Sequence, residues 1–113
     1  MARQPSIKAT KEQTDGYETL NPLLLSMYDE FQELSKKKQD GIVATIKVKM
    51  VNRLLKSIHK ILENEPNHAF LDLLNEDDLP QNSDVVIILG QTKAAMNAFR
   101  SKYWDSSFRE WKV

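Results

Sequence analysis

The sequence predicts an all-α protein, a small bundle of three long helices plus one short helix, preceded by a flexible N-terminal tail. Three segments place apolar residues at helical spacing, and stretches rich in Asn, Asp and Pro separate them. At 113 residues the chain has the size of one domain, and 41% hydrophobic with 28% charged residues is typical of a globular protein.

Residues 1–20 are expected to form a mobile tail, because residues 1–18 include Pro5 and Gly16 and offer almost nothing to bury. Residues 21–105 should form the helical bundle domain. Residues 106–113 form an aromatic C-terminal tail, for which two arrangements stay open. The tail either folds back on the bundle or remains free.

The first helix is predicted over residues 22–37. Asn21 can cap free backbone amides, and Pro22 suits the first helical position because no partner exists there for its missing amide. Lys36, Lys37 and Lys38 suit the negative end of the helix dipole. The apolar face of this helix comprises Leu24, Met27, Tyr28, Phe31 and Leu34.

The second helix, residues 45–64 with Thr45 as N-cap, is the segment around which the chain is organised. It carries an apolar stripe and a basic stripe together. Residues 42–51 also alternate as a strand would, and their one candidate partner is residues 85–89. We favour the helix. Its apolar stripe comprises Val48, Val51, Leu54, Leu55, Ile58, Ile61 and Leu62, and its basic stripe Lys49, Arg53, Lys56 and Lys60.

A short buried helix is predicted over residues 69–74, followed by a loop over residues 75–83. The last long helix should span residues 84–104, capped by Asn82 or Ser83, although Gly90 within it costs about 1 kcal/mol relative to alanine. Its apolar face comprises Ile88, Thr92, Ala95, Met96, Phe99 and Tyr103.

Charge is segregated along the chain although the total is zero. Residues 36–60 hold eight basic side chains and one acidic one, a net charge of plus seven, and residues 61–84 hold seven acidic side chains and no Lys or Arg. The favoured interpretation is that these blocks attract each other within the fold or are simply solvated. Alternatively, the basic stripe is left open as a partner site, widened by Lys47 and residues 36–38.

No cofactor or metal is expected, and the protein is not predicted to be an enzyme. His59 and His68 fit no metal-ligand spacing and are interpreted as a surface residue and a turn residue. Three glycines cannot build a phosphate-binding loop, and residues 75–78 lack the central glycine of a calcium loop.

The predicted function is a non-enzymatic helical protein–protein interaction or regulatory module, whose partner is another protein, a second copy as a homodimer included. The alternative is a nucleic-acid-associated regulator that uses the basic stripe of residues 45–64, with Asn52 able to reach a base edge. No aromatic residue accompanies that stripe, which disfavours single-stranded targets. The candidate partner-binding residues are Lys49, Arg53, Lys56, Lys60, Arg100, Trp104, Phe108 and Trp111.

The expected location is the cytoplasm, without membrane contact. The chain has no cysteine and no apolar run near the roughly 20 residues of a membrane span, and residues 1–17 lack the apolar centre of a secretion signal.

Overall fold

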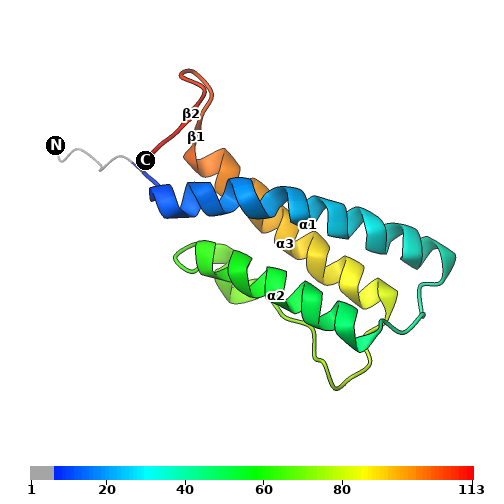
Figure 1. The fold of residues 1–113 in the computed structure, drawn as a ribbon. Coiled ribbons are helices and arrows are strands. Elements are labelled where there is room, and N and C mark those ends of the chain that lie inside the picture. The colour runs from blue at the N-terminus through cyan, green and yellow to red at the C-terminus, as the bar shows by residue number, and fades with distance from the viewer. Residues whose placement is uncertain (1–6) are drawn as a thin grey trace.

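The computed structural model describes residues 7–113 as a three-helix bundle with a small hairpin at its C-terminal end (Figure 1). The predicted three long helices and one short helix are present, and a two-stranded antiparallel sheet is added to them. The elements are α1 Lys11–Lys37, α2 Thr45–Ile61, the 3₁₀ helix η1 Pro66–Phe70, α3 Asn82–Tyr103, β1 Trp104–Asp105 and β2 Glu110–Trp111.

The predicted start of the first helix at Pro22 is wrong, because α1 begins at Lys11. Thr10 caps this helix through a reciprocal pair of hydrogen bonds. The Gln13 amide donates to Thr10 Oγ1 at 3.1 Å, and the Thr10 amide donates to Gln13 Oε1 at 2.8 Å. Part of the predicted mobile tail is therefore helical, whereas residues 1–6 of it lie outside the described residues.

Pro22 lies inside α1 because tertiary burial outweighs its local cost. A proline in a helix interior costs about 3 kcal/mol, since it removes one backbone hydrogen bond. The turns before it bury Thr14 and Tyr17 in the bundle. Asn21 does not cap a helix here, and its buried Oδ1 has no hydrogen-bond partner in the described chain.

The helical interpretation of residues 45–61 is confirmed, and all seven predicted apolar residues of α2 are buried. Two details differ from the prediction. Ala44 occupies the N-cap position in place of Thr45, and the helix ends at Ile61, three residues earlier than expected. The strand alternative is wrong, because residues 45–51 and 85–89 are helical and Ile42 forms its single backbone bridge with Gln81.

The third helix starts two residues before its predicted start. Its N-cap is Gln81, whose amide donates to Asp84 Oδ2 at 2.9 Å, so neither Asn82 nor Ser83 fills that position. Asn82 instead donates through Nδ2 to the Lys38 carbonyl at 2.9 Å and joins α3 to the end of α1. Five residues of the predicted apolar face are buried, and Ile88 packs against the core partly exposed.

The segment between α2 and α3 differs most from the prediction. The short helix is a 3₁₀ turn at residues 66–70, and the chain then runs without helix to Gln81. Asn52 of α2 holds this connection with two buried hydrogen bonds. Its Nδ2 donates to the Leu74 carbonyl and its Oδ1 accepts from the Leu74 amide, both at 2.9 Å.

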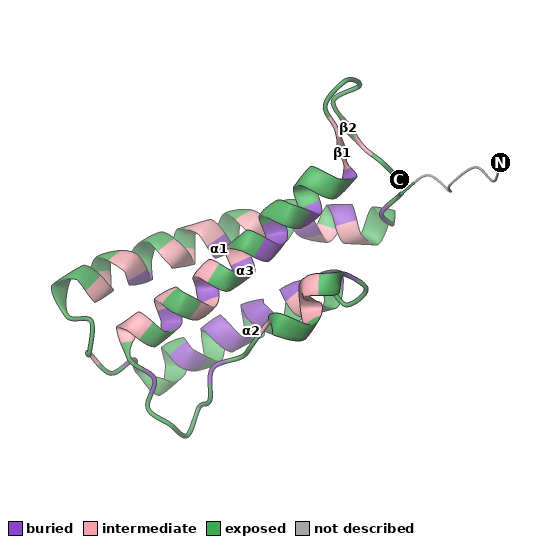
Figure 2. Cartoon of the chain, turned by 180° about the vertical axis from the view of Figure 1, so that it is seen from behind, coloured by how far each residue is buried: buried purple, intermediate pink, exposed green. Residues whose placement is uncertain are grey.

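One hydrophobic core fills the space where the three helices face each other, and the outward faces are exposed (Figure 2). Gly16 allows α1 to approach the end of α2 closely, because a Cβ atom there would lie 2.7 Å from Ile61 Cδ1. Among the helices described, none is long and apolar enough to cross a membrane.

Replacing Asn52 with alanine tests the anchor between α2 and the following loop. Asn52→Ala removes both bonds and leaves the buried amide and carbonyl of Leu74 unpaired, so we expect the free energy of unfolding to fall by about 3 kcal/mol. Urea denaturation measures this loss. Asn97→Ala, an exposed change on α3, is the control and should alter stability by less than about 0.5 kcal/mol. Equal effects of the two variants would contradict the anchoring role.

Candidate functional site

The four basic residues predicted on α2 form an exposed row along its outer side. Lys49, Arg53, Lys56 and Lys60 are exposed, because the buried apolar residues occupy the opposite arc of the helix. None of the four has an acidic group within 4 Å among residues 7–113. We refer to these four residues as the basic row, and their charge is available to a partner.

The interpretation that the basic and acidic blocks face each other within the fold is not supported by ion pairs. The three pairs in the described chain are Lys36–Glu33 at 3.1 Å, Lys47–Glu30 at 3.7 Å and Lys102–Glu65 at 3.4 Å. None of them connects residues 36–60 with residues 61–84. Most members of both blocks are exposed, although Glu65 is buried and bonds to the end of α3.

A groove runs between α1 and α2 beside the basic row. It consists of two adjoining hollows of about 440 and 390 Å³ that share Leu20 and Ser57 in their walls. The apolar side chains Leu23 and Met50 line the first hollow although they are 54% and 47% exposed. Arg53 stands in the wall of the first hollow beside Glu30, and Lys60 stands in the wall of the second beside Glu12 and Glu63. The first hollow is mainly apolar, so the groove has an apolar floor at that end and charged residues of both signs along its rim.

The aromatic candidates at the C-terminal end mostly contact one another. Trp111 packs against Tyr17 and Trp104 with ring centroids 5.1 and 5.4 Å apart. Its Nε1 donates to Glu18 Oε1 at 2.8 Å, and Arg100 lies over the Trp104 ring at 4.5 Å. The predicted tail thus folds back as a hairpin.

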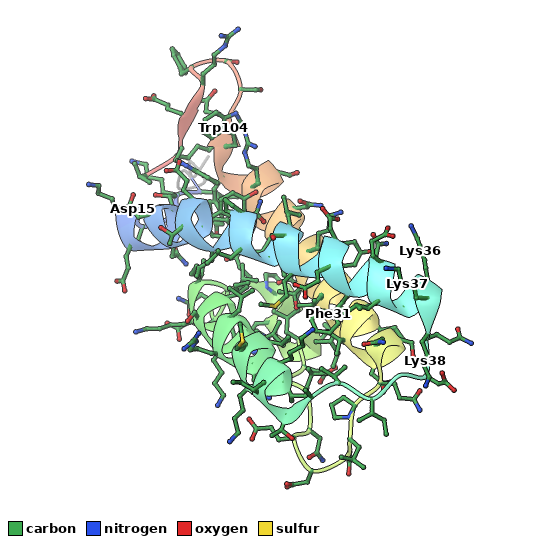
Figure 3. All side chains as sticks on the ribbon, turned by 45° about the vertical axis from the view of Figure 1, so that its right-hand side comes forward. Asp15, Phe31, Lys36, Lys37, Lys38 and Trp104 are labelled. Atoms are coloured by element: carbon green, nitrogen blue, oxygen red, sulfur yellow. The ribbon has the colours of Figure 1, made fainter. Side chains whose placement is uncertain are left out.

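Phe108 is the exception, since 76% of it is exposed in the turn between β1 and β2. The structure therefore separates the predicted site residues into two groups. The basic row lies on α2, and the aromatic group lies where the hairpin leaves α3. Figure 3 shows Trp104 at the base of that hairpin, with Lys36, Lys37 and Lys38 at the opposite end of α1.

The three lysines at the end of α1 line the wall of an open hollow of about 660 Å³. Lys36 pairs with Glu33, and the Lys38 carbonyl accepts hydrogen bonds from Gly41 and Asn82. The carbonyl end of a helix carries partial negative charge, which these side chains offset. This cluster accordingly neutralises the helix end and lies apart from the groove.

His59 is not the surface residue that the sequence suggested. It is half-buried, and its Nε2 has no hydrogen-bond partner in the part of the chain that the structure describes. Its ring lies 6.1 Å from that of His68. Burial lowers the pKa of His59 below its usual 6.5, and His68 lowers it further, while Asp72 acts in the opposite direction.

Asn52 is unavailable for reading a nucleic-acid base, since it is 4% exposed and both its side-chain atoms bond to Leu74. Glu65 is likewise occupied within the fold. Its carboxylate accepts hydrogen bonds from the Tyr103 hydroxyl at 2.9 Å and Lys102 Nζ at 3.4 Å. Burial and the bond to Glu65 raise the pKa of Tyr103. These groups connect η1 to the end of α3.

Comparison of the chain with protein-family models, with curated proteins and with solved structures finds no match. The functional inference therefore depends on the groove, the basic row and the exposed apolar residues described above.

The lowered pKa of His59 predicts a loss of stability in acid. The unfolded chain takes up a proton near pH 6.5, whereas the folded chain resists it, so stability falls as the pH drops below that value toward the folded pKa. Between about pH 7.5 and about pH 5.5, the free energy of unfolding should fall less in His59→Leu than in the parent chain. His68→Leu should retain most of the parent chain's fall, because burial is the main cause of the shift.

NMR titration of the imidazole signals, together with urea denaturation at both pH values, measures this effect. A His59 pKa at or above 6.5 would contradict it.

Proposed function

We propose that this protein is a non-enzymatic protein–protein interaction module whose docking site is the groove between α1 and α2. The partner segment is an acidic amphipathic helix, with its apolar side in the groove and its carboxylates against the basic row. The observation that carries this proposal is a partly apolar groove with Arg53 and Lys60 in its walls, two members of a row of four exposed cations without an ion pair among the described residues.

The apolar floor supplies the favourable free energy of docking. Leu23 and Met50 are about half exposed, and covering apolar surface contributes about 25 cal/mol for each Å² removed from water. Methionines suit such a surface because their flexible side chains adapt to a partner's shape. Met27 and Met50 both line this groove.

The basic row supplies orientation and selectivity. Its members recur every three or four residues, so they follow one side of α2 and can meet carboxylates repeating at the same interval on a partner helix. Charge complementarity of this kind favours acidic partners and speeds association more than it adds affinity.

The length of the groove indicates how much of a partner it can hold. Its wall on α2 reaches from Met50 to Ile61, which corresponds to about 16 Å at 1.5 Å per residue. A helix of about three turns covers that length. Recognition through side chains spaced at i, i+3, i+4 and i+7 is a recurrent way for a groove to bind a helix.

A nucleic-acid-associated regulator remains the competing proposal, because the same row could follow a phosphate backbone. Burial of Asn52 removes the one side chain considered for contact with a base. The apolar floor of the groove also has no role against phosphates. Both observations favour a protein partner.

A labelled amphipathic peptide of about four turns provides the probe, with leucines on one face and glutamates on the flanks. We expect it to bind the full chain in fluorescence anisotropy, and a scrambled peptide of the same composition to bind far less. Arg53→Glu combined with Lys60→Glu, which reverses the basic residue in the wall of each hollow, should weaken binding about tenfold, equivalent to about 1.4 kcal/mol, by placing like charges together.

Lys37→Glu is the matched control, since it reverses a lysine that is exposed at the end of α1 and lines neither hollow of the groove. The affinity of Lys37→Glu for the peptide should equal that of the parent chain. Duplex DNA and RNA, titrated at two salt concentrations, complete the test. Failure to bind the peptide, together with duplex binding that salt abolishes steeply, would reject the protein-binding proposal in favour of the alternative.

A further inference from the structure

A second apolar surface lies at the end of the bundle where α2 and α3 begin. Its members come from the connection before α2, the first turn of α2, the loop after η1 and the second turn of α3. Each exposes between 39% and 70% of its surface. We refer to Ile42, Ile46, Leu73, Leu79 and Ile87 as the end patch.

Backbone contacts bring these segments together. Ile42 bridges Gln81, and the Val43 amide donates to the Pro80 carbonyl at 2.8 Å, so the chain around Leu79 lies beside the start of α2. Figure 1 shows this loop next to the beginning of α2. On its other side, Leu73 and Ile87 share with Pro80 a shallow hollow of about 300 Å³.

Leu79 is the most unusual member of the end patch. Its φ angle is +50°, in the left-handed region that disfavours residues other than Gly, Asn and Asp, and its side chain is 61% exposed. Strained backbone and an apolar side chain in water both oppose folding of a single chain. A partner that covers Leu79 would remove its apolar side chain from water and so offset the second of these two unfavourable terms.

The loop is held in place before any partner arrives. Asn52 fixes Leu74 with two hydrogen bonds, and Asn75 bonds to both the Asp77 amide and the Asp78 carboxylate at 2.9 Å. A surface that is already ordered loses less conformational entropy on binding. The end patch is therefore preorganised.

Exposed charges of opposite sign lie on the segments that carry the end patch. Exposed acidic residues lie on the loop and the first turn of α3, and exposed basic residues lie on the first turns of α2. Neither set forms an ion pair with the other within residues 7–113, and the one ion pair of the basic set joins Lys47 to Glu30 of α1 at 3.7 Å. The acidic flank is Glu76, Asp77, Asp78 and Asp84, and the basic flank is Lys47 and Lys49.

We propose that the end patch binds the end patch of a second copy of this chain around a two-fold axis. Such an arrangement stacks the apolar residues at the centre and brings the acidic flank of each copy to the basic flank of the other. Because the end patch carries both an acidic and a basic flank, it is complementary in charge to the same patch on a second copy. The net charge of zero adds no overall repulsion between two chains.

The amount of exposed apolar surface agrees with this use. Monomeric proteins rarely expose contiguous apolar patches above a few hundred Å², and larger patches mark interaction sites. The end patch gathers five large aliphatic side chains, four of them at least 60% exposed, in segments that the backbone brings together. This homodimer goes beyond the groove, which stays open on a different part of the molecule.

Leu79→Asn tests the apolar centre of the contact. Asparagine tolerates the left-handed conformation, so the variant keeps the loop geometry while removing the apolar side chain. Arg109→Asn is the matched control, because Arg109 has a φ of +53° in the hairpin, outside the end patch. Sedimentation equilibrium of the full chain should give twice 13.1 kDa at high micromolar concentration for the parent and the control. Leu79→Asn should weaken dimerisation at least tenfold.

A mixing experiment tests the two-fold arrangement. One variant combines Lys47→Glu with Lys49→Glu, and the other combines Glu76→Lys, Asp77→Lys and Asp78→Lys, which leaves a net positive charge on the former acidic flank. Each alone places like charges together across both halves of the contact and should be monomeric. An equimolar mixture restores opposite charges in both halves and should form a heterodimer.

Three outcomes would overturn the proposal: a parent chain that stays monomeric at high micromolar concentration, dimers that withstand all these changes, or masses that grow beyond two copies as head-to-tail contacts would produce. Peptide binding in the groove, measured on the parent chain and on Leu79→Asn, separates this result from the proposed function, because Leu79 lines neither hollow of the groove. A monomeric chain that still binds the peptide refutes the dimer alone.

Discussion

Burial of the apolar arc of α2 against the rest of the bundle determines the outer surface of this protein. Val48, Leu55, Ile58 and Leu62 are almost completely shielded, and a helix that directs these residues inward must direct the basic row outward. The same packing sets α2 beside α1 and leaves the groove between them. The basic row and the groove therefore both follow from how one helix is seated.

Local periodicity was enough to predict α2 and α3, because each repeats a continuous apolar face over many turns. Periodicity failed at the start of α1. The cap signal of Asn21 and Pro22 competes there with the packing of Tyr17 against Phe99 and Trp111, which lie far along the chain. Thr10 and Gln13, three residues apart, are the local signal for this start, because they form a capping box. The partners of Asn52 and the burial of His59 depend on the 66–74 segment, whose position no local pattern predicts.

The basic row was the part of the candidate site accessible from sequence, whereas the groove and the end patch were not. A groove arises from the distance between two helices, and the exposure of Leu79 follows from a loop held by Asn52. The two surfaces use different parts of α2, with the end patch at its first turns and the groove farther along. A dimer formed through the end patch would thus present two copies of the groove.

Residue-resolved amide hydrogen exchange tests the seating of α2 most directly. The amides of Val51, Leu55 and Ile58 should exchange as slowly as those of Leu89 and Met96 in α3, through global unfolding, while residues 76–79 exchange rapidly. Exchange of the α2 amides at rates close to those of residues 76–79 would contradict this account, since a helix that opens independently of the bundle could not maintain the groove or hold the basic row in place.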